Sequence, residues 1–398
     1  MRLLVLLTAA CLSASLALAQ AEKQSTANTQ AAGSRAEERK ATKAAPFPLQ
    51  LEIRVPFEPT AFPSGPRVYL MYELHLTNYL AMPLSLVRIE ALDADAAGEQ
   101  PIASFAAEQL ESMLQPLGGK NSADRKERLL LAGGQSAIAY MCVTFGPNER
   151  IPNKLRHRVS TADSALEGAV IGTHHTELHV LGPPVEGANW LAADGPSNDE
   201  DNHHRRGVVV LDGQAVDSRR YAVDWKQVTG NASFSGDARD VHSYYSYGKA
   251  VLAVADGRVV LARDGLPDNT PGHGEAFHPA VPITLETITG NTITLDIGGG
   301  QFAYYLHLQS GTLRVKAGDQ VRRGQVLANI GASGDAREPH LHFEVTTSSK
   351  ALAGEGVPYL IDRYRSRSAN DGPIELRIRE LPLNNSIVLF GADQSSGK

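Results

Sequence analysis

Two histidines stand two residues apart near the end of the chain, in the stretch EPHLHFEVTT (338–347). Side chains of a β-strand alternate between its two faces, so His340, His342 and Glu344 would share one face, with the imidazoles about 7 Å apart along the strand. Leu341 and Phe343 would lie on the opposite, core-facing side. A metal could then take one imidazole as a ligand while the other faced the metal's bound water. The alternative, which an H-x-H pattern alone favours, is a pair of surface histidines on a solvated strand.

Two further polar side chains fall within apolar strand patterns. His307 ends the pattern FAYYLHLQS, where alternation predicts that it shares a face with Ala303 and Tyr305. Asp224 lies in RRYAVDW, on the face opposite its two apolar neighbours. A buried carboxylate is costly unless it is paired or binds a metal. An aspartate with histidine ligands and an open fourth position is the composition of a catalytic zinc site.

The segments that carry these residues indicate a β-rich region over 204–365. Short apolar runs such as AVLAVADGRVVLA, NTITLDI and QFAYYLHL are separated by Gly-rich turns, and few segments show a helical period. We therefore expect an antiparallel β-sheet or partly open barrel, followed by a C-terminal extension, 366–398, that adds one or two strands. The connector before it, 181–203, is rich in Pro, Gly and Asp and is expected to be a linker.

The preceding region, 46–180, is also predicted to be mainly β. Alternating patterns such as LQLEIRVPF and RVYLMYELHLTN, punctuated by Pro and Gly, are typical of an immunoglobulin-like β-sandwich. Residues 103–115 could form a short helix or a longer loop. We see no catalytic chemistry in this region.

The first residues have the layout of an export signal. Residues 1–19 contain one positive charge, an apolar run and a final Ala-Leu-Ala, and we expect cleavage after Ala19. The apolar run is interrupted by Thr8, and that residue also disfavours lipid modification of Cys11, because leucine would be expected there. Residues 20–45 have the composition of a flexible tether. These features predict an exported, periplasmic bacterial protein with no transmembrane segment once the signal is removed.

Composition excludes two other classes of protein. The net charge of −6 gives no support for nucleic-acid binding, because proteins that contact phosphates are usually basic. After signal removal only Cys142 remains, so the fold has no internal disulfide to rely on.

In order and surroundings, the motifs YAVDW, YYLHLQSGTLRVKAGDQVRRGQVLANIGASG and EPHLHFEV resemble the lysostaphin-type (LytM-like) zinc metalloendopeptidases, over about 204–348. In that family zinc is held by a histidine, by an aspartate four residues later and by the second histidine of the final H-x-H. The resemblance implies Asp224 and His342 as ligands of Zn2+. It implies His340 and His307 as the catalytic pair that activates the water or stabilises the oxyanion.

The chain departs from this pattern at Arg220, which stands four residues before Asp224 where the family has its first histidine. Arginine has no lone pair to give a metal. Either the site is inactive, or a histidine displaced upstream supplies the ligand, as in a subgroup of the family. Asp212-Gly213 predicts a hairpin turn that would bring His204 close to Asp224. His204 is favoured over His203 as the third metal ligand.

The resemblance implies an exported zinc-dependent endopeptidase that hydrolyses peptide bonds in peptidoglycan cross-links by a metal-activated water. Its partners would be peptidoglycan peptides. The alternative, based on Arg220, is a catalytically inactive LytM-like protein that binds the cell wall or activates other murein hydrolases.

Overall fold

The computed structural model describes residues 47–118, 124–368 and 372–391. The expected signal peptide, Cys11 and the tether lie outside the described residues. The described residues from Leu49 onward belong to one compact unit. Within the part of the chain that the structure describes, no helix has both the length and the apolar character needed to cross a membrane.

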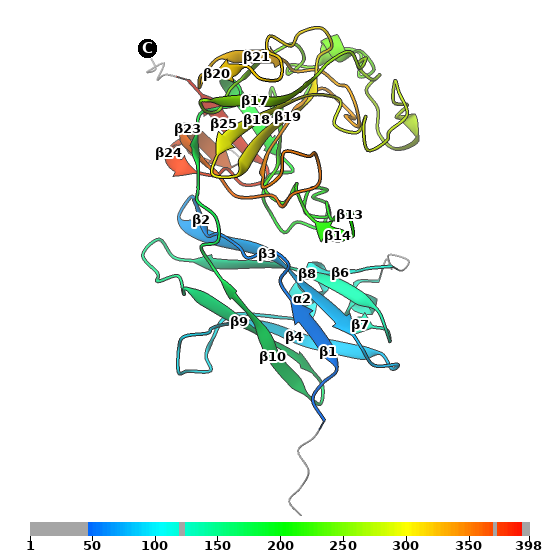
Figure 1. Cartoon of the computed structure of the whole chain (residues 1–398), viewed down its shortest axis with the longest axis vertical. Coiled ribbons are helices and arrows are strands. Elements are labelled where there is room, and N and C mark those ends of the chain that lie inside the picture. The colour runs from blue at the N-terminus through cyan, green and yellow to red at the C-terminus, as the bar shows by residue number, and fades with distance from the viewer. Residues whose placement is uncertain (1–46, 119–123, 369–371, 392–398) are drawn as a thin grey trace, which may run out of the picture. The chain divides into compact units, whose positions relative to one another are not determined.

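The first strands form two five-stranded sheets (Figure 1). One sheet contains β1 (Leu51–Arg54), β2 (Phe62–Ser64), β3 (Arg67–Asn78), β6 (Leu114–Pro116) and β8 (Ser136–Phe145). The other contains β4 (Leu84–Asp93), β5 (Pro101–Ala106), β7 (Leu130–Leu131), β9 (Lys154–Thr161) and β10 (Ala165–Gly172). A short helix, α2 (Ala107–Met113), lies within the region where a helix or loop was expected, and a 3-10 turn, η1 (Arg125–Leu129), follows β6.

Both sheets contribute to one hydrophobic core. Leu70 and Leu74 of β3 belong to the same buried cluster as Ile89 of β4 and Val159 of β9. Apolar side chains therefore gather between the sheets, as the alternating patterns of these strands require. The immunoglobulin-like topology stays a prediction.

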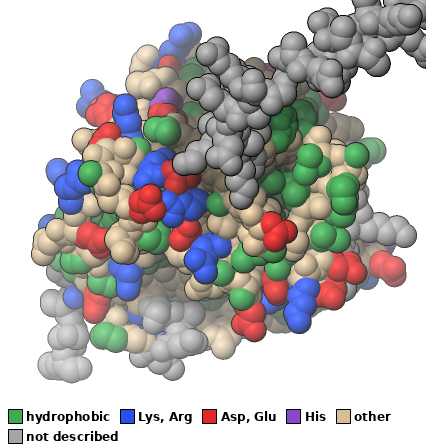
Figure 2. Space-filling model, turned by 90° about the horizontal axis from the view of Figure 1, so that it is seen from below, with side chains coloured by type: hydrophobic (Ala, Val, Ile, Leu, Met, Phe, Trp, Pro, Cys, Tyr) green, Lys and Arg blue, Asp and Glu red, His purple; other side chains and the backbone are tan. Residues whose placement is uncertain are grey.

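Basic and acidic side chains are interspersed on the face shown in Figure 2.

The rest of the chain is built around an open sheet that does not close into a barrel. Its path runs β11-β23-β25-β12-β15-β22-β19-β18-β17-β20, and β24 pairs with β23. The bounds are β11 (Val180–Leu181), β12 (Gly187–Ala193), β15 (Val223–Gln227), β17 (Gly257–Arg263), β18 (Asn291–Gly298), β19 (Gln301–Leu308), β20 (Gln320–Val321), β22 (Leu341–Thr346), β23 (Leu360–Ser368), β24 (Glu375–Glu380) and β25 (Ser386–Phe390). Pairing is antiparallel except between β11 and β23.

Two small strand pairs and two 3-10 turns complete the fold. The pairs are β13 (Val209–Leu211) with β14 (Gln214–Val216), and β16 (Ala250–Leu252) with β21 (Val326–Asn329). The turns are η2 (Val241–Ser243) and η3 (Gly274–Ala276). The mainly β fold class is confirmed.

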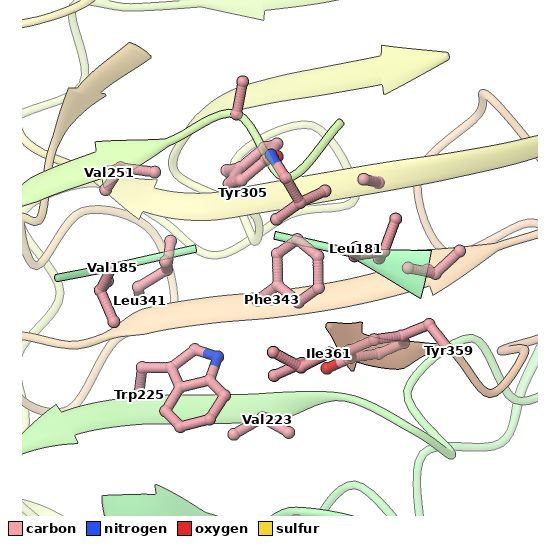
Figure 3. Close-up of a cluster of buried hydrophobic side chains, with 14 of the residues drawn as sticks. Leu181, Val185, Val223, Trp225, Val251, Tyr305, Leu341, Phe343, Tyr359 and Ile361 are labelled. Atoms are coloured by element: carbon pink, nitrogen blue, oxygen red, sulfur yellow. The ribbon is translucent and has the colours of Figure 1, made fainter. Parts of the chain in front are cut away.

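One face of the central strands packs into a second hydrophobic core, shown in Figure 3. Trp225 of β15, Phe343 of β22 and Tyr305 of β19 point into it, and each is essentially inaccessible to solvent. Because side chains alternate along a strand, the residues between these core positions are directed to the opposite face. That second face carries the candidate site.

Two segments at the margins of the predicted domains also enter the large sheet. Residues 181–203, expected to be a linker, contain β12, which pairs with β15 and β25. The expected C-terminal extension contributes β24 and β25. Asp194 directly follows β12, and Ala193 pairs with Asp224, so this segment runs straight to the candidate site. The domain boundaries themselves stay predictions.

Candidate metal centre and active site

Strand pairing brings Asp224 and His342 face to face. The two residues are register partners between β15 and β22, and His342 Nδ1 lies 3.0 Å from Asp224 Oδ1. Asp224 is 3% and His342 4% exposed, and His340 is 6% exposed. A solvated strand face is therefore excluded, and the buried carboxylate needs a compensating positive charge.

His307 reaches the same face by a route that alternation does not predict. Its expected neighbours Ala303 and Tyr305 point into the core, so the prediction that all three share a face was wrong. His307 has φ = 63°, a left-handed conformation that is uncommon for a residue other than glycine. This conformation turns its ring toward His340, with the centroids 4.9 Å apart, while the next residue, Leu308, returns to the core.

The third predicted ligand comes from the turn that follows β12. His204 is buried, and its Nε2 lies 3.4 Å from Asp224 Oδ1. His203 Nε2 lies 3.7 Å from Asp224 Oδ2, but this side chain is 49% exposed and its Nδ1 faces Asp194 Oδ1 at 3.1 Å. The ligand atoms of His203, His204 and Asp224 lie within 4.8 Å of one another. Both histidines that the sequence offered are therefore close to the carboxylate.

The Asp212-Gly213 hairpin exists as predicted, between β13 and β14, with both residues at positive φ. Its strand pairing ends at Val209–Val216 and does not extend to His204. The approach of His204 to Asp224 is set instead by the loop and turn of residues 194–206.

Acceptors fix the orientation of each imidazole by binding the ring nitrogen that faces away from the cluster. Nδ1–H groups are donated to backbone carbonyls at 2.7–2.8 Å, from His204 to Asp194, from His307 to Ser333 and from His340 to Glu338. The Nε2 of His342 instead faces Glu344 Oε2 at 3.3 Å. Because these acceptors hold the outer N–H groups, the inner nitrogens are free to present lone pairs.

The inner nitrogens converge on one carboxylate oxygen. His204 Nε2, His340 Nε2 and His342 Nδ1 lie 3.4, 3.4 and 3.0 Å from Asp224 Oδ1. His204 Nε2 is buried and has no hydrogen-bond partner. Lone pairs facing a carboxylate without a proton or cation between them repel one another, so the arrangement calls for a bound positive charge.

Electrostatics assign the proton of the metal-free site to one histidine. Burial lowers the pKa of His204 to about 4, and burial with neighbouring His340 places the pKa of His307 well below its usual range. Burial also opposes charge on His342, but its contacts to Asp224 and Glu344 outweigh this and raise its pKa to about 9. His342 Nδ1 thus holds a proton where a metal ion would exchange for it.

The donor set suits zinc. Zinc is bound by histidine nitrogen and carboxylate oxygen, and a catalytic zinc site has three protein ligands and an open position. With bonds of about 2.0–2.1 Å in a tetrahedron, neighbouring donor atoms stand roughly 3.3 Å apart. The separations from Asp224 Oδ1 to His204 Nε2 and His342 Nδ1 are close to that value. The separation to His340 Nε2 is similar, so distance alone does not separate ligand from catalytic base.

The cluster opens into a cleft of about 510 Å³, lined by Asp224, His307, His340 and His342 among others. A second hollow of about 400 Å³ shares His273 and Glu338 with it. An extended chain could therefore run past the histidines. Lys226 and Glu338, paired at 2.9 Å, lie beside the cluster.

Arg220 directs its guanidinium to other partners. It pairs with Glu73 of β3 at 2.7 Å and donates to Ser197 O and Asn198 Oδ1. Burial opposes its charge, but Glu73 and Asp217 outweigh this and raise the pKa of Arg220 above its ordinary value. The residue in the family's usual ligand position thus has a contact set of its own.

Sequence reasoning missed two acceptors of the site. Alternation placed Glu344 on the strand face of His340 and His342, but the sequence analysis gave it no role as an acceptor. Asp194, which has φ = 49° and whose carbonyl accepts from His204, gave no local signal.

Comparison with known proteins gives one family. Residues 240–353 match the model of Peptidase family M23. The chain is 33% identical over 107 residues to the murein hydrolase activator EnvC of Escherichia coli, covering 27% of this chain and 20% of that protein. It is 31% identical over 105 residues to the peptidoglycan DD-endopeptidase ShyB of Vibrio cholerae, covering 26% and 19%. The chain thus spans about a fifth of the length of these two relatives.

Among solved structures, the catalytic domain of lysostaphin from Staphylococcus simulans matches 43% of this chain and 86% of that chain. The identity is 21% and the TM-score 0.22, too low to compare the two sites.

Proposed function

From the M23 peptidase domain in residues 240–353, we infer that this chain is an exported zinc-dependent endopeptidase that hydrolyses peptide bonds in peptidoglycan cross-links. The observation that carries the inference is the convergence of oriented imidazole nitrogens on Asp224 Oδ1 beside an open cleft. The description of ShyB as a peptidoglycan endopeptidase supports the substrate class. The signal-like residues 1–19 support export, to the periplasm.

In this proposal Asp224, His204 and His342 hold the metal. His204 is preferred to His203 because its Nε2 is buried and without another partner, whereas His203 is half exposed and faces Asp194. His342 is preferred to His340 because a carboxylate, Glu344, holds its outer nitrogen, a common arrangement behind histidines that bind metals. When bound, zinc would supply an activated water and polarise the scissile carbonyl.

His340 and His307 remain for proton transfer and for stabilising the oxyanion. Both line the cleft, and their Nδ1–H groups are held by backbone carbonyls. Burial lowers the pKa of His307, so its ring is neutral at physiological pH and its free nitrogen can accept a hydrogen bond from the attacking water, whereas His340 would take the proton and return it to the leaving amine. The left-handed backbone of His307 is the strain that this placement requires.

A second candidate function is a protein that binds the wall or activates other murein hydrolases without cutting. It is favoured by Arg220 in the ligand position and by the description of EnvC as an activator. The alternative differs from the main proposal in its chemistry, because it requires no turnover at the cleft.

Metal content and cleavage separate these functions. Purified protein should bind about one zinc per chain and release new amino groups from isolated peptidoglycan, and His340→Ala should abolish cleavage while keeping zinc. His242→Ala, at a 74% exposed histidine, is the matched control and should leave cleavage unchanged. Protein that binds zinc but never cuts would favour the second function, whereas protein that binds no zinc at micromolar concentration would refute the zinc site.

A further inference from the structure

We propose that Arg220 is a positioning residue for His204, and that strand β3 of the first sheet helps to build the metal centre through it. The inference rests on the proposed zinc site. It assigns a role to the residue that departs from the family pattern and to a region in which the sequence showed no chemistry.

The guanidinium of Arg220 joins two parts of the chain that are far apart in sequence. It pairs through Nε with Glu73 Oε1 at 2.7 Å, and it donates to Ser197 O at 2.7 Å and to Asn198 Oδ1 at 2.6 Å. The residue is only 3% exposed. Asn198 in turn donates to the Tyr140 carbonyl of β8 at 2.6 Å. The start of the 194–206 loop is therefore fixed to the first sheet at two points, Glu73 of β3 and Tyr140 of β8.

From there the contacts lead to His204. Asn202 Nδ2 donates to Ser197 Oγ at 3.0 Å and to Gly195 O at 2.7 Å. Asn202 Oδ1 accepts from the backbone N–H of His204 at 2.9 Å. The turn that orients the His204 imidazole thus rests on the segment that Arg220 holds.

A second arginine attaches the far end of the loop to the same region. Arg205, directly after His204, lies over the Tyr140 ring with its Cζ 4.7 Å from the ring centroid. It donates to Ser112 O at 3.1 Å and to the Asn198 carbonyl. It is 2% exposed, so both ends of the turn are fixed by buried cationic side chains.

Arginine is suited to contacting Glu73, Ser197 and Asn198 at the same time. Its planar fork offers five N–H donors, enough for a carboxylate, a carbonyl and an amide oxygen at once, whereas an imidazole has two nitrogens. A histidine at position 220 would lose this set of contacts. His204 as the displaced ligand and Arg220 in place of the family's first histidine are therefore parts of a single arrangement.

Zinc affinity tests the proposal, measured by competition with a chelator on the full chain. Arg220→Gln should weaken zinc binding by about 10–100-fold, as loss of an outer-shell partner does. In a His204→Ala background the same substitution should have little further effect, because the arginine acts through His204. Arg220→Lys, which keeps charge but not the fork, should fall between. Arg323→Gln, which breaks the exposed pair with Asp362, is the matched control.

Hydrogen exchange on the zinc-free protein gives a readout without metal and without turnover. The variants are Arg220→Gln and the milder Asn198→Ala, which removes the side chain that links Arg220 to Tyr140 O. In both variants the amides of His204 and Gly207 should exchange at least about tenfold faster than in the wild type. Their acceptors are Asn202 Oδ1 and His204 O. Amides of the central strand β22 should be unaffected if the variants are folded.

The outcomes are distinct. Unchanged zinc affinity and exchange in both variants, or an Arg220 effect of the same size with and without His204, would overturn the positioning role and leave the zinc site standing. Wild-type protein that binds no zinc would overturn the proposed function, and the exchange measurement would still decide whether Arg220 holds the loop.

Discussion

The carboxylate behind His342 offers the sharpest single test of the metal centre. Glu344 is 1% exposed, and its Oε2 lies 3.3 Å from His342 Nε2. We expect Glu344→Gln to weaken zinc binding about tenfold, because the amide oxygen still accepts the N–H but the charge is lost. Glu344→Leu should weaken it about 100-fold, because no acceptor then holds Nε2–H and keeps Nδ1 directed toward Asp224.

These factors follow from the distance and the burial. At 3.3 Å and an effective dielectric constant of about 20, a carboxylate and a full positive charge on the ring attract by about 5 kcal/mol, which is an upper limit because a metal-bound imidazole carries only part of that charge. Desolvation of the buried carboxylate offsets much of this. The remainder is expected to be about 1.4 kcal/mol for the charge and about 2.8 kcal/mol for charge and acceptor together, which correspond to tenfold and 100-fold.

The assay is zinc competition with a chelator of known affinity, at pH 7 and fixed ionic strength, with unfolding curves to confirm that each variant is folded. Glu275→Gln, at an exposed glutamate, is the control and should bind zinc like the wild type. Affinities of both Glu344 variants within twofold of the wild type would refute the argument that this carboxylate orients a metal ligand.

Three further outcomes are expected. His307→Asn keeps a residue that tolerates a left-handed backbone but removes the imidazole, so cleavage should fall about 10²–10⁴-fold with zinc affinity unchanged; a parallel loss of zinc would show that His307 is a ligand instead. Burial lowers the pKa of His157 to about 4, so the unfolded state binds more protons at this residue between about pH 4 and 6.5, and His157 should add about 3 kcal/mol to the rise in unfolding free energy across that window. In denaturant titrations of His157→Gln the rise should be smaller than in the wild type by about that amount, because other buried histidines such as His204 still contribute. An identical profile would contradict the assignment. Removing zinc with a chelator should lower the unfolding free energy, measured by calorimetry, by about 2.7 kcal/mol relative to protein with free zinc at 100 times Kd. In His204→Ala this difference should be smaller, because less zinc is bound.

Local alternation explains what could be predicted from the sequence. Asp224 and His342 each lie between core residues on a regular strand, so a period of two was enough to place them on the opposite face. The mainly β fold class follows from the same patterns. The turn at Asp212-Gly213 is equally local, because positive φ at both residues favours that pair.

What escaped prediction depends on contacts between distant segments. The rotation at His307 depends on partners that hold its backbone, Thr289 O and Gly331 N, which no strand pattern encodes. The role of β12 in the large sheet was hidden by its Pro- and Gly-rich surroundings. The partners of Arg220 lie up to 147 positions earlier in the chain, at Glu73, so its contacts were not readable from local sequence.

The carbonyl acceptors behind the histidines have a consequence for how this protein tolerates genetic change. Three imidazoles are oriented by main-chain oxygens of Asp194, Ser333 and Glu338, which every amino acid supplies. A missense change at those positions leaves the acceptor atom in place as long as the backbone keeps its path. Among the acceptors of these four outer ring nitrogens, that of His342 is a side chain, Glu344. In a saturation mutagenesis screen for zinc binding, position 344 should therefore be the intolerant one among these four acceptor positions.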